Sequence, residues 1–189
     1  MGLLDSFRRT SDIATLSGQG VSLRFPVPDD FEAWSGLRAR SRDFLEPWEP
    51  VWPSDELSPA AFRIRIRRYR QLRNEDLCYP YFIFSGGNFV GAATLSNVRR
   101  GVAHTATLGY WIGQPYARSG YMSRALSLLL PHCFSTLALH RVEAACLPRN
   151  TASIRLLEKV GFEREGYARS YLQIAGRWED HLLYAKIGP

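Results

Sequence analysis

Hydrophobic and polar residues alternate with a period of two along residues 21–25, Val-Ser-Leu-Arg-Phe, and this pattern predicts a first β-strand. Two prolines follow and end the strand. Asp29 and Asp30 then precede apolar residues at helical spacing, which predicts a helix capped by these aspartates and running to about Arg42. The apolar positions of this helix are Phe31, Trp34 and Leu37.

A second helix is predicted from Ser58 to about Asn74, with Phe62, Ile66 and Tyr69 on its buried side. Three strand-like runs come next, at residues 79–85, 89–98 and 104–112. Short turns with glycine separate them, so we expect an antiparallel meander.

After residue 113 the period changes from two to about 3.6. A helix is predicted at residues 121–137, a strand at 141–147 and a helix at 151–160. This order implies a right-handed crossover with local parallel pairing. Two further strands close the chain, at residues 162–167 with a continuation to 174, and at residues 178–187. The expected fold class is therefore mixed α/β.

A chain of 189 residues corresponds to one domain. Residues 1–20 are interpreted as an N-terminal leader and residues 21–189 as the domain. No apolar run approaches the roughly 18 residues needed to span a bilayer, so we expect no membrane partner. Three widely spaced cysteines without a C-x-x-C motif indicate a reduced, cytoplasmic protein. Cys133 and Cys146 lie in apolar runs and are expected to be buried core thiols.

The net charge is +6, and 22 of the 24 cationic side chains are arginine. Arginine suits bidentate contacts with phosphate and carboxylate, but base composition of the source genome explains the bias equally well. Six arginines crowd into the second helix between Arg63 and Arg73. This cationic face is either a solvated surface or a docking surface for an anionic partner.

Residues 45–53 form a loop stiffened by three prolines, and the loop also carries Trp48, Glu49 and Trp52. It is interpreted either as the wall of a substrate pocket or as a plug over the core. Trp48 and Glu49 are the candidate substrate-binding residues.

The junction at residues 108–122 leads from a strand through a short loop into a helix N-terminus. Free amides and the helix dipole favour a pyrophosphate there. Neither G-x-G-x-x-G nor a P-loop motif is present, so a Rossmann or P-loop site is excluded. Further on, Asn150 is a good helix N-cap and Gly161 a good helix C-terminal residue.

This order of strand, loop and helix, followed by N-x-x-S and E-K-x-G-F at residues 150–162, resembles the GCN5-related N-acetyltransferase (GNAT) superfamily. The blocks F-L-E-P-W-E-P-V, S-N-V-R-R-G, L-G-Y-W-I-G, Y-M-S-R-A-L and G-F-E-R-E-G-Y-A-R-S-Y-L look like the RimJ type of ribosomal-protein-alanine N-acetyltransferase. The resemblance covers about residues 20–188.

The resemblance implies a twisted, mostly antiparallel sheet of about seven strands, splayed in the middle and flanked by about four helices. Acetyl-CoA is expected in the splayed gap as co-substrate. The residues expected to bind it are Tyr110 and Ile112 by their backbone, the loop Arg118, Ser119, Gly120, Tyr121 and Met122, and Asn150.

Two departures from the family pattern affect the expected chemistry. Arg118 replaces a loop glycine, and no tyrosine lies near Leu157 to protonate the leaving thiolate, so Ser153 is the candidate acid. Glu49 is the candidate base or ammonium anchor, with a loop salt bridge as its alternative role. No histidine has metal-ligand spacing, and we expect no metal.

The resemblance implies acetyl transfer to an amine, foremost the N-terminal α-amino group of a ribosomal protein. One alternative is a small amine, such as a polyamine or an antibiotic, and five acidic residues between Asp43 and Glu56 keep it open. Another is a non-catalytic module that binds acetyl-CoA or the ribosome. The Arg63–Arg73 helix is the candidate ribosome contact, and both monomer and homodimer remain open.

Overall fold

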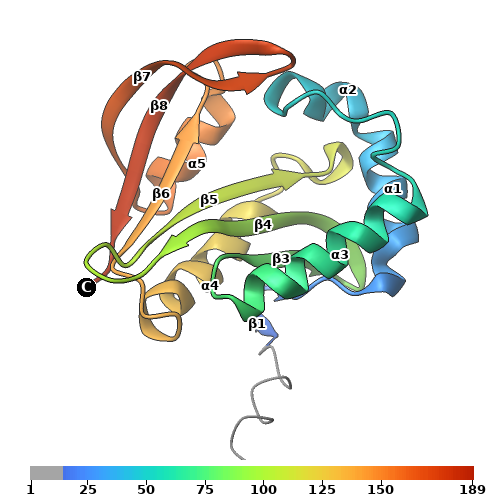
Figure 1. Cartoon of the computed structure of the whole chain (residues 1–189), viewed down its shortest axis with the longest axis horizontal. Coiled ribbons are helices and arrows are strands. Elements are labelled where there is room, and N and C mark those ends of the chain that lie inside the picture. The colour runs from blue at the N-terminus through green and yellow to red at the C-terminus, as the bar shows by residue number, and fades with distance from the viewer. Residues whose placement is uncertain (1–14) are drawn as a thin grey trace, which may run out of the picture.

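The computed structural model describes residues 15–189, which build one eight-stranded mixed sheet (Figure 1). The strands are β1 (Leu16–Gly18), β2 (Val21–Arg24), β3 (Tyr79–Ser85), β4 (Asn88–Arg99), β5 (Thr105–Ile112), β6 (Arg141–Cys146), β7 (Glu163–Ile174) and β8 (Arg177–Ile187). Their order across the sheet is β1-β2-β3-β4-β5-β6-β8-β7. Only β5 and β6 pair in parallel, and every other neighbouring pair is antiparallel.

Five α-helices flank the described sheet: α1 (Phe31–Arg40), α2 (Arg42–Leu45), α3 (Pro59–Asn74), α4 (Tyr121–Ser135) and α5 (Thr151–Lys159). Short 3-10 helices occupy Pro28–Asp30, Glu46–Trp48 and Gln114–Tyr116. The expected fold class, with its predicted meander and crossover, is confirmed. The described part has one strand and one α-helix more than expected.

The sheet opens between β5 and β6. Their parallel pairing is limited to residues 105–107 of β5 and 141–143 of β6. Beyond that point, β5 pairs only with β4, and β6 pairs only with β8. The two strands diverge in Figure 1, with β6, β7 and β8 swinging away from β3, β4 and β5. The predicted splay in the middle of the sheet is therefore present, and it leaves two facing strand edges.

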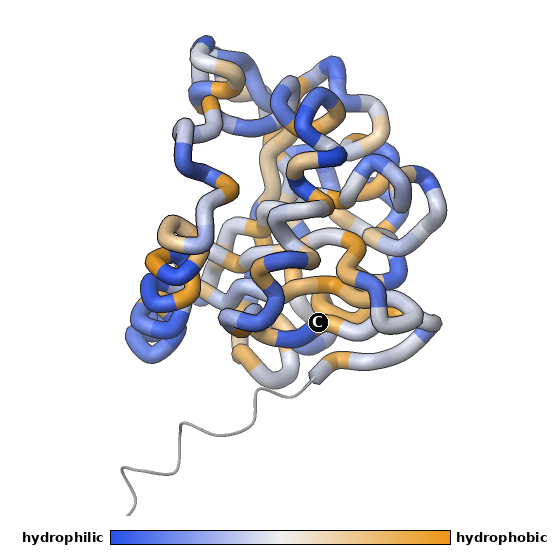
Figure 2. Tube along the Cα trace, turned by 90° about the vertical axis from the view of Figure 1, so that its right-hand side faces the viewer, coloured by the Kyte–Doolittle hydropathy of each residue, from blue (hydrophilic) through white to orange (hydrophobic). Residues whose placement is uncertain are grey.

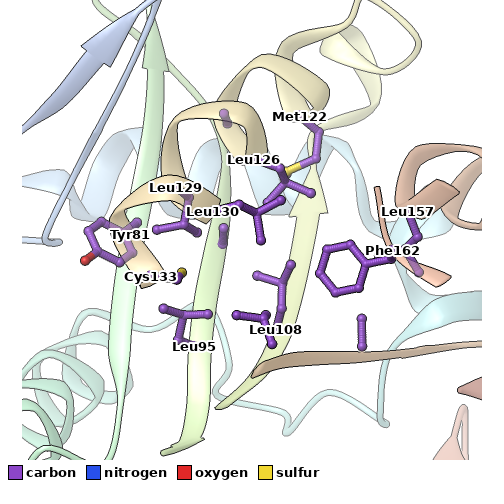
Figure 3. Packing of buried hydrophobic residues seen from close by; sticks show 14 of the residues in the cluster. Tyr81, Leu95, Leu108, Met122, Leu126, Leu129, Leu130, Cys133, Leu157 and Phe162 are labelled. Atoms are coloured by element: carbon purple, nitrogen blue, oxygen red, sulfur yellow. The ribbon is translucent and has the colours of Figure 1, made fainter. Parts of the chain in front are cut away.

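Two hydrophobic clusters hold the helices to the sheet. The larger one packs α4 against β3, β4 and β5, and it includes Leu126, Leu129 and Cys133 of α4 (Figure 3). The smaller one joins α1 and α3 to the opposite face through Trp34, Phe62 and Ile66. Burial on both faces fixes the strands that carry the site, since the core packs at close to crystal density.

The expected boundary at residue 20 is wrong for its last residues. Leu16–Gly18 form β1, which pairs antiparallel with β2 across a tight turn at Gln19 and Gly20. The three-residue strand has no room for an alternating pattern, so only its pairing with β2 reveals it. The earlier part of the proposed leader, residues 1–14, lies outside the described residues.

The helix expected from Asp29 to Arg42 is also interrupted. Asp30 does not cap it, because its carboxylate accepts hydrogen bonds from Arg24 and from the amide of Val27. The helix breaks at the buried Ser41, whose hydroxyl accepts a hydrogen bond of 2.9 Å from the amide of Gln114. This contact ties the end of α1 to the segment that follows β5.

Within residues 15–189, no helix is both long enough and apolar enough to cross a membrane. Cys133 and Cys146 are free and buried, as expected, and Cys78 is free and buried as well.

Candidate active site

Tyr110 and Ser153 meet where the sheet opens. Tyr110 lies on β5 beyond the last residue that pairs with β6, and Ser153 lies in the first turn of α5, which follows β6. The tyrosine hydroxyl and the serine Oγ are 2.6 Å apart. This side-chain hydrogen bond therefore joins β5 to α5, beyond the residues where β5 and β6 pair through their backbones.

The position of Ser153 is fixed by both ends of its helix. At the N-terminus, the side chain of Asn150 accepts a hydrogen bond of 3.1 Å from the amide of Ser153. At the C-terminus, Gly161 adopts a φ of 85° and the amide of Phe162 donates to the carbonyl of Leu157. These are the N-cap and the glycine-terminated helix end that the sequence predicts.

The Tyr110 hydroxyl keeps its proton at neutral pH. Burial raises the pKa of Tyr110 above its ordinary value, and the hydrogen bond with Ser153 opposes this shift less strongly. Burial likewise raises the pKa of the nearby Cys146 thiol, so this cysteine is not poised as a thiolate nucleophile. Among the groups at this junction, the two hydroxyls are suited to proton transfer.

The loop before α4 has the conformation of an anion site. Arg118 adopts a φ of 59° and Gly120 a φ of 77°, so the arginine occupies the left-handed region that usually favours glycine. The first amide of the helix with a backbone partner among the described residues is that of Arg124, which donates to Gly120. The preceding amides are therefore free for a ligand, as in other helix N-termini that bind phosphate.

Arg124, in the first turn of α4, is not among the residues predicted to bind the cofactor. Its guanidinium lies 4.7 Å from the ring centroid of Tyr121, and its Nε is buried without a hydrogen-bond partner in residues 15–189. The unpaired Nε and the exposed Arg118 flank the free amides, which supports an anionic ligand there. The side chain of Met122, in contrast, is buried in the core.

Tyr110 also lines a cavity of about 640 Å³. The walls of this cavity come from β3, β4, β5, α1, α3 and residues 49–53, and they are rich in aromatic side chains. The charged residues that line it are Arg38, Glu49, Glu56 and Arg65, and its main aromatic residues are Trp34, Trp52, Tyr69, Phe82, Tyr110 and Trp111. Residues 49–53 of the proline-rich loop therefore form a wall of this cavity, which agrees with the pocket-wall interpretation of the loop.

Arg38 organises this cavity. Its side chain is 5% exposed and makes a bidentate ion pair with Glu49, with N–O distances of 3.2 and 2.6 Å. It also lies 3.6 Å from the carboxylate of Glu56. Its guanidinium stacks 4.1 Å from the ring centroid of Trp52 and 5.0 Å from that of Trp111. One buried cation thus joins α1, the loop and β5.

Glu49 forms the salt bridge that the sequence allowed as its alternative role. Its carboxylate accepts two bonds from Arg38 and one of 2.7 Å from the indole of Trp52. A carboxylate offers about four acceptor positions, so one remains for a further donor. The backbone of Glu49 also accepts the amide of Ala175, at the tip of the β7–β8 hairpin.

Trp48 is not among the residues that line the cavity. It ends the short helix before Glu49, and the guanidinium of Arg149 lies 5.9 Å from its ring centroid. Trp52, four residues later, lines the cavity instead. The local composition of the loop could not distinguish the two tryptophans, because only the partner Arg38 determines which one turns inward.

Other features lie apart from this site. A larger cavity of about 930 Å³ sits between the end of α4 and the ends of β6 and β8, and none of the predicted site residues lines it. In the described part of the chain, no three His, Cys, Asp or Glu side chains are grouped as metal ligands are. Asp180 accepts hydrogen bonds from Tyr167 and from the amide of Ser170, and so stabilises the β7–β8 hairpin.

Comparison with known proteins gives a consistent family. Residues 21–163 match the family described as acetyltransferase (GNAT) domain. The chain is 36% identical to the [ribosomal protein uS5]-alanine N-acetyltransferase of Escherichia coli, over 85% of this chain and 84% of that protein. It is 35% identical to the probable N-acetyltransferase YjcK of Bacillus subtilis, over 92% of this chain and 97% of that protein.

Solved structures agree. The RimJ protein of Mycobacterium smegmatis in complex with CoA-disulfide superimposes with a TM-score of 0.85 at 36% identity, over 89% of this chain and 82% of that one. The ribosomal-protein-S5-alanine acetyltransferase of Vibrio fischeri superimposes with a TM-score of 0.86 at 30% identity, over 92% and 96%.

Proposed function

The chain belongs to the acetyltransferase (GNAT) domain family, and on that premise we propose that it transfers acetyl from acetyl-CoA to the N-terminal α-amino group of a ribosomal protein. The acetyltransferase class follows from the family and from relatives named N-acetyltransferases. The acceptor is the proposed part, and the charge balance of the cavity is the observation that carries it.

The charges of the four ionised side chains that line the cavity sum to zero. Two arginines, Arg38 and Arg65, face two glutamates, Glu49 and Glu56, and each glutamate is within ion-pair distance of an arginine. A polyamine or aminoglycoside carries several cations and needs uncompensated carboxylates. A single amine on a small apolar residue fits neutral, aromatic walls better. The cavity therefore supports a polypeptide N-terminus over a polycationic small molecule.

Acetyl-CoA is the proposed co-substrate, and the chain has a fitting cradle for it. When bound, it supplies the thioester that the amine attacks. The exposed edge of β5 at Tyr110 and Ile112 offers backbone groups for the pantetheine arm. Residues 118–122 offer free amides, and Arg118 and Arg124 offer cations, for the pyrophosphate. Asn150 supports this cradle by capping the helix that carries Ser153.

Ser153 is the proposed proton donor to the departing sulfur, and Tyr110 positions its hydroxyl. With the Tyr110 hydroxyl donating in the 2.6 Å contact, the serine keeps its own proton for the sulfur. An α-amino group has a pKa of roughly 7.7–8.0, so a fraction of it is unprotonated at neutral pH. The reaction therefore does not require a strong base. With three donors already on its carboxylate, Glu49 fits the ammonium-anchor role better than that of base.

We further propose that the protein acts in the cytoplasm, where ribosomal proteins are made, and that no metal takes part. Contact with a ribosome through the Arg63–Arg73 helix also stands as a proposal. The alternative of a non-catalytic acetyl-CoA-binding module is tested together with the activity.

The experiment measures release of the CoA thiol with a panel of acceptors. Peptides that begin with alanine or serine, the same peptides with blocked N-termini, a polyamine and an aminoglycoside are compared. We expect turnover with the free alanine peptide and none with its blocked form. Preference for the polyamine would replace the proposed acceptor, and acetyl-CoA binding without any turnover would favour the non-catalytic module.

A further inference from the structure

We infer that the exposed face of α3 binds the phosphate backbone of RNA. This inference goes beyond acetyl transfer and stands without it. In Figure 2, α3 lies at the left of the view as a mostly hydrophilic segment. Six of its sixteen residues are arginine and none is acidic.

Genome base composition does not account for this clustering. The whole chain has 22 arginines in 189 residues, and an even spread would put about one in every nine positions. Residues 63–73 instead hold six in eleven positions. Composition raises arginine everywhere, so it leaves the local density on one helix unexplained.

The fold uses only two of these six arginines. Arg65 pairs with Glu56 at 2.7 Å and packs over the ring of Trp34. Arg73 lies over the ring of Phe25. The other four, Arg63, Arg67, Arg68 and Arg70, are exposed and form no ion pair within residues 15–189. Their charges serve no contact in the described fold.

Three of the four form a straight row. Arg63, Arg67 and Arg70 are spaced four and three residues apart, which places them on one side of the helix. At 1.5 Å per residue, the row extends about 10 Å along the axis. Like charges at this spacing destabilise a helix, and no acidic residue alternates with them to relieve the repulsion. An anionic partner would relieve it.

RNA fits this face better than an acidic protein does. Protein interfaces are depleted of charge at their centre and enriched in aromatic residues. The exposed side of α3 offers one large apolar residue, Ile64, and is otherwise polar. Interfaces with nucleic acid are more polar and more positive, and a nucleic-acid duplex is densely charged, with about one phosphate charge per 1.7 Å of axis in DNA. The row therefore faces several phosphates over its length.

The position of α3 relates this surface to the acceptor cavity. Arg65 of α3 and Glu56, just before the helix, both line that cavity. Phosphate contacts at Arg63, Arg67 and Arg70 would thus hold the cavity close to a bound RNA. A protein whose N-terminus emerges beside such RNA would be presented to the cavity, without any base being read.

The test measures binding of a short RNA duplex as a function of salt. The variant Arg63→Gln/Arg67→Gln/Arg70→Gln is compared with Arg155→Gln/Arg164→Gln/Arg177→Gln, which removes the same charge from exposed arginines elsewhere. We expect the α3 variant to lower the slope of log affinity against log salt by about 2 to 3, at roughly 0.7–0.9 per lost phosphate contact, and to weaken binding at low salt more than tenfold. The control triple should change the slope by less than about 1.

Acetylation of a free peptide by the α3 variant should be unchanged, which separates this proposal from the proposed enzyme activity. Equal losses in both triples would mean that net charge alone acts, and the inference would be wrong. It would also be wrong if the α3 variant kept RNA binding and lost binding only to polyglutamate, since the partner would then be an acidic protein.

Discussion

The hydroxyl of Tyr110 lies 2.6 Å from Oγ of Ser153, although the two residues are 43 positions apart in the chain. The contact exists because β5 and β6 pair for only three residues and then diverge, which leaves room for side chains between them. Because β5 and β6 diverge, the hydroxyls of Tyr110 and Ser153 can meet in the space between the two strands.

Ser153→Ala should lower kcat by about a hundredfold and leave acetyl-CoA affinity within about twofold, because general acid catalysis contributes roughly 10² or more. The Asn150 cap accepts from the backbone of residue 153, so the helix should survive the change. Tyr110→Phe should cost less, about tenfold in kcat, since it removes only the orientation of the serine. Stopped-flow turnover and isothermal titration measure the two quantities.

The double variant provides the control for this pair. If Tyr110 acts through Ser153, adding Tyr110→Phe to Ser153→Ala should cost little more. Tyr79→Phe, which removes a hydroxyl bonded to Asp76 away from the site, should leave kcat unchanged. Additive losses in the double variant would give Tyr110 a role of its own.

Glu49→Gln should leave the acid limb of the pH–rate profile in place and raise the KM of the acceptor several-fold. The rate rises with pH as the acceptor amine loses its proton, with an apparent pKa near the amine value of about 7.7–8.0. Burial raises the pKa of Tyr110, so its ionisation should not reduce the rate at neutral pH. The measurement is kcat/KM across this range, and a flattened limb would instead make Glu49 the base.

These contacts mark how far the sequence could predict the site. The free amides before α4 and the caps of α5 follow from local sequence signals, such as the glycine at position 120 and the Asn150 side chain. Glu49 is predictable because it is an acidic residue in a loop that proline stiffens and tryptophan flanks. Arg38 was missed, since its burial depends on Glu49 and Trp52, which lie eleven or more residues away and meet it only after folding.

The strands show the same division. The strands β3 to β8 follow from their apolar patterns and turns. The three residues of β1 carry no pattern of their own, and the break at Ser41 depends on Gln114, which lies 73 residues later in the chain. Local periodicity thus predicts the long helices and strands. Short strands and helix breaks depend on contacts with distant parts of the chain.

Arg38→Met should destabilise the protein by roughly 3 kcal/mol, because a buried partner is lost and two carboxylates remain without it. Glu49 would keep only the Trp52 bond, and Glu56 only Arg65. Urea unfolding measures the free energy. The matched control is Arg42→Met, which breaks an exposed i,i+4 pair with Glu46 and should cost under about 1 kcal/mol. Similar losses in both variants would contradict the organising role of Arg38.

The Asp76–Arg100 pair should make stability fall in acid. Hydrogen bonding to Arg100 holds the pKa of Asp76 below its ordinary value. The stabilisation is therefore complete above the unfolded pKa of about 3.9 and is lost as the pH falls through the lower folded value. Asp76→Asn should reduce the free energy of unfolding at pH 7 by less than about 1 kcal/mol, since the pair is partly exposed.

At a pH below the folded pKa, Asp76→Asn and the parent should unfold alike. Asparagine tolerates the φ of 58° at this position, so the substitution tests the charge and not the backbone. Asp29→Asn, which removes an exposed carboxylate without an ion pair in residues 15–189, should stay within about 0.5 kcal/mol of the parent at pH 7. A loss that stays constant with pH would assign the effect to packing.

Arg118→Gly and Gly120→Ala should separate backbone strain from charge in the loop before α4. Both positions have positive φ, 59° at Arg118 and 77° at Gly120. A Cβ at Gly120 meets no atom within 4 Å, so Gly120→Ala should cost only the strain of its φ, about 1–2 kcal/mol, measured by thermal unfolding. Arg118→Gly relieves the backbone strain of the folded state but raises the conformational entropy of the unfolded chain. The two effects oppose each other, so stability should change by less than about 1 kcal/mol. Because Arg118→Gly also removes a cation, it should weaken acetyl-CoA binding. Arg118→Lys keeps the charge and should bind acetyl-CoA almost as tightly as the parent. Unchanged affinity in Arg118→Gly, measured by titration at low salt, would show that the amides alone hold the pyrophosphate.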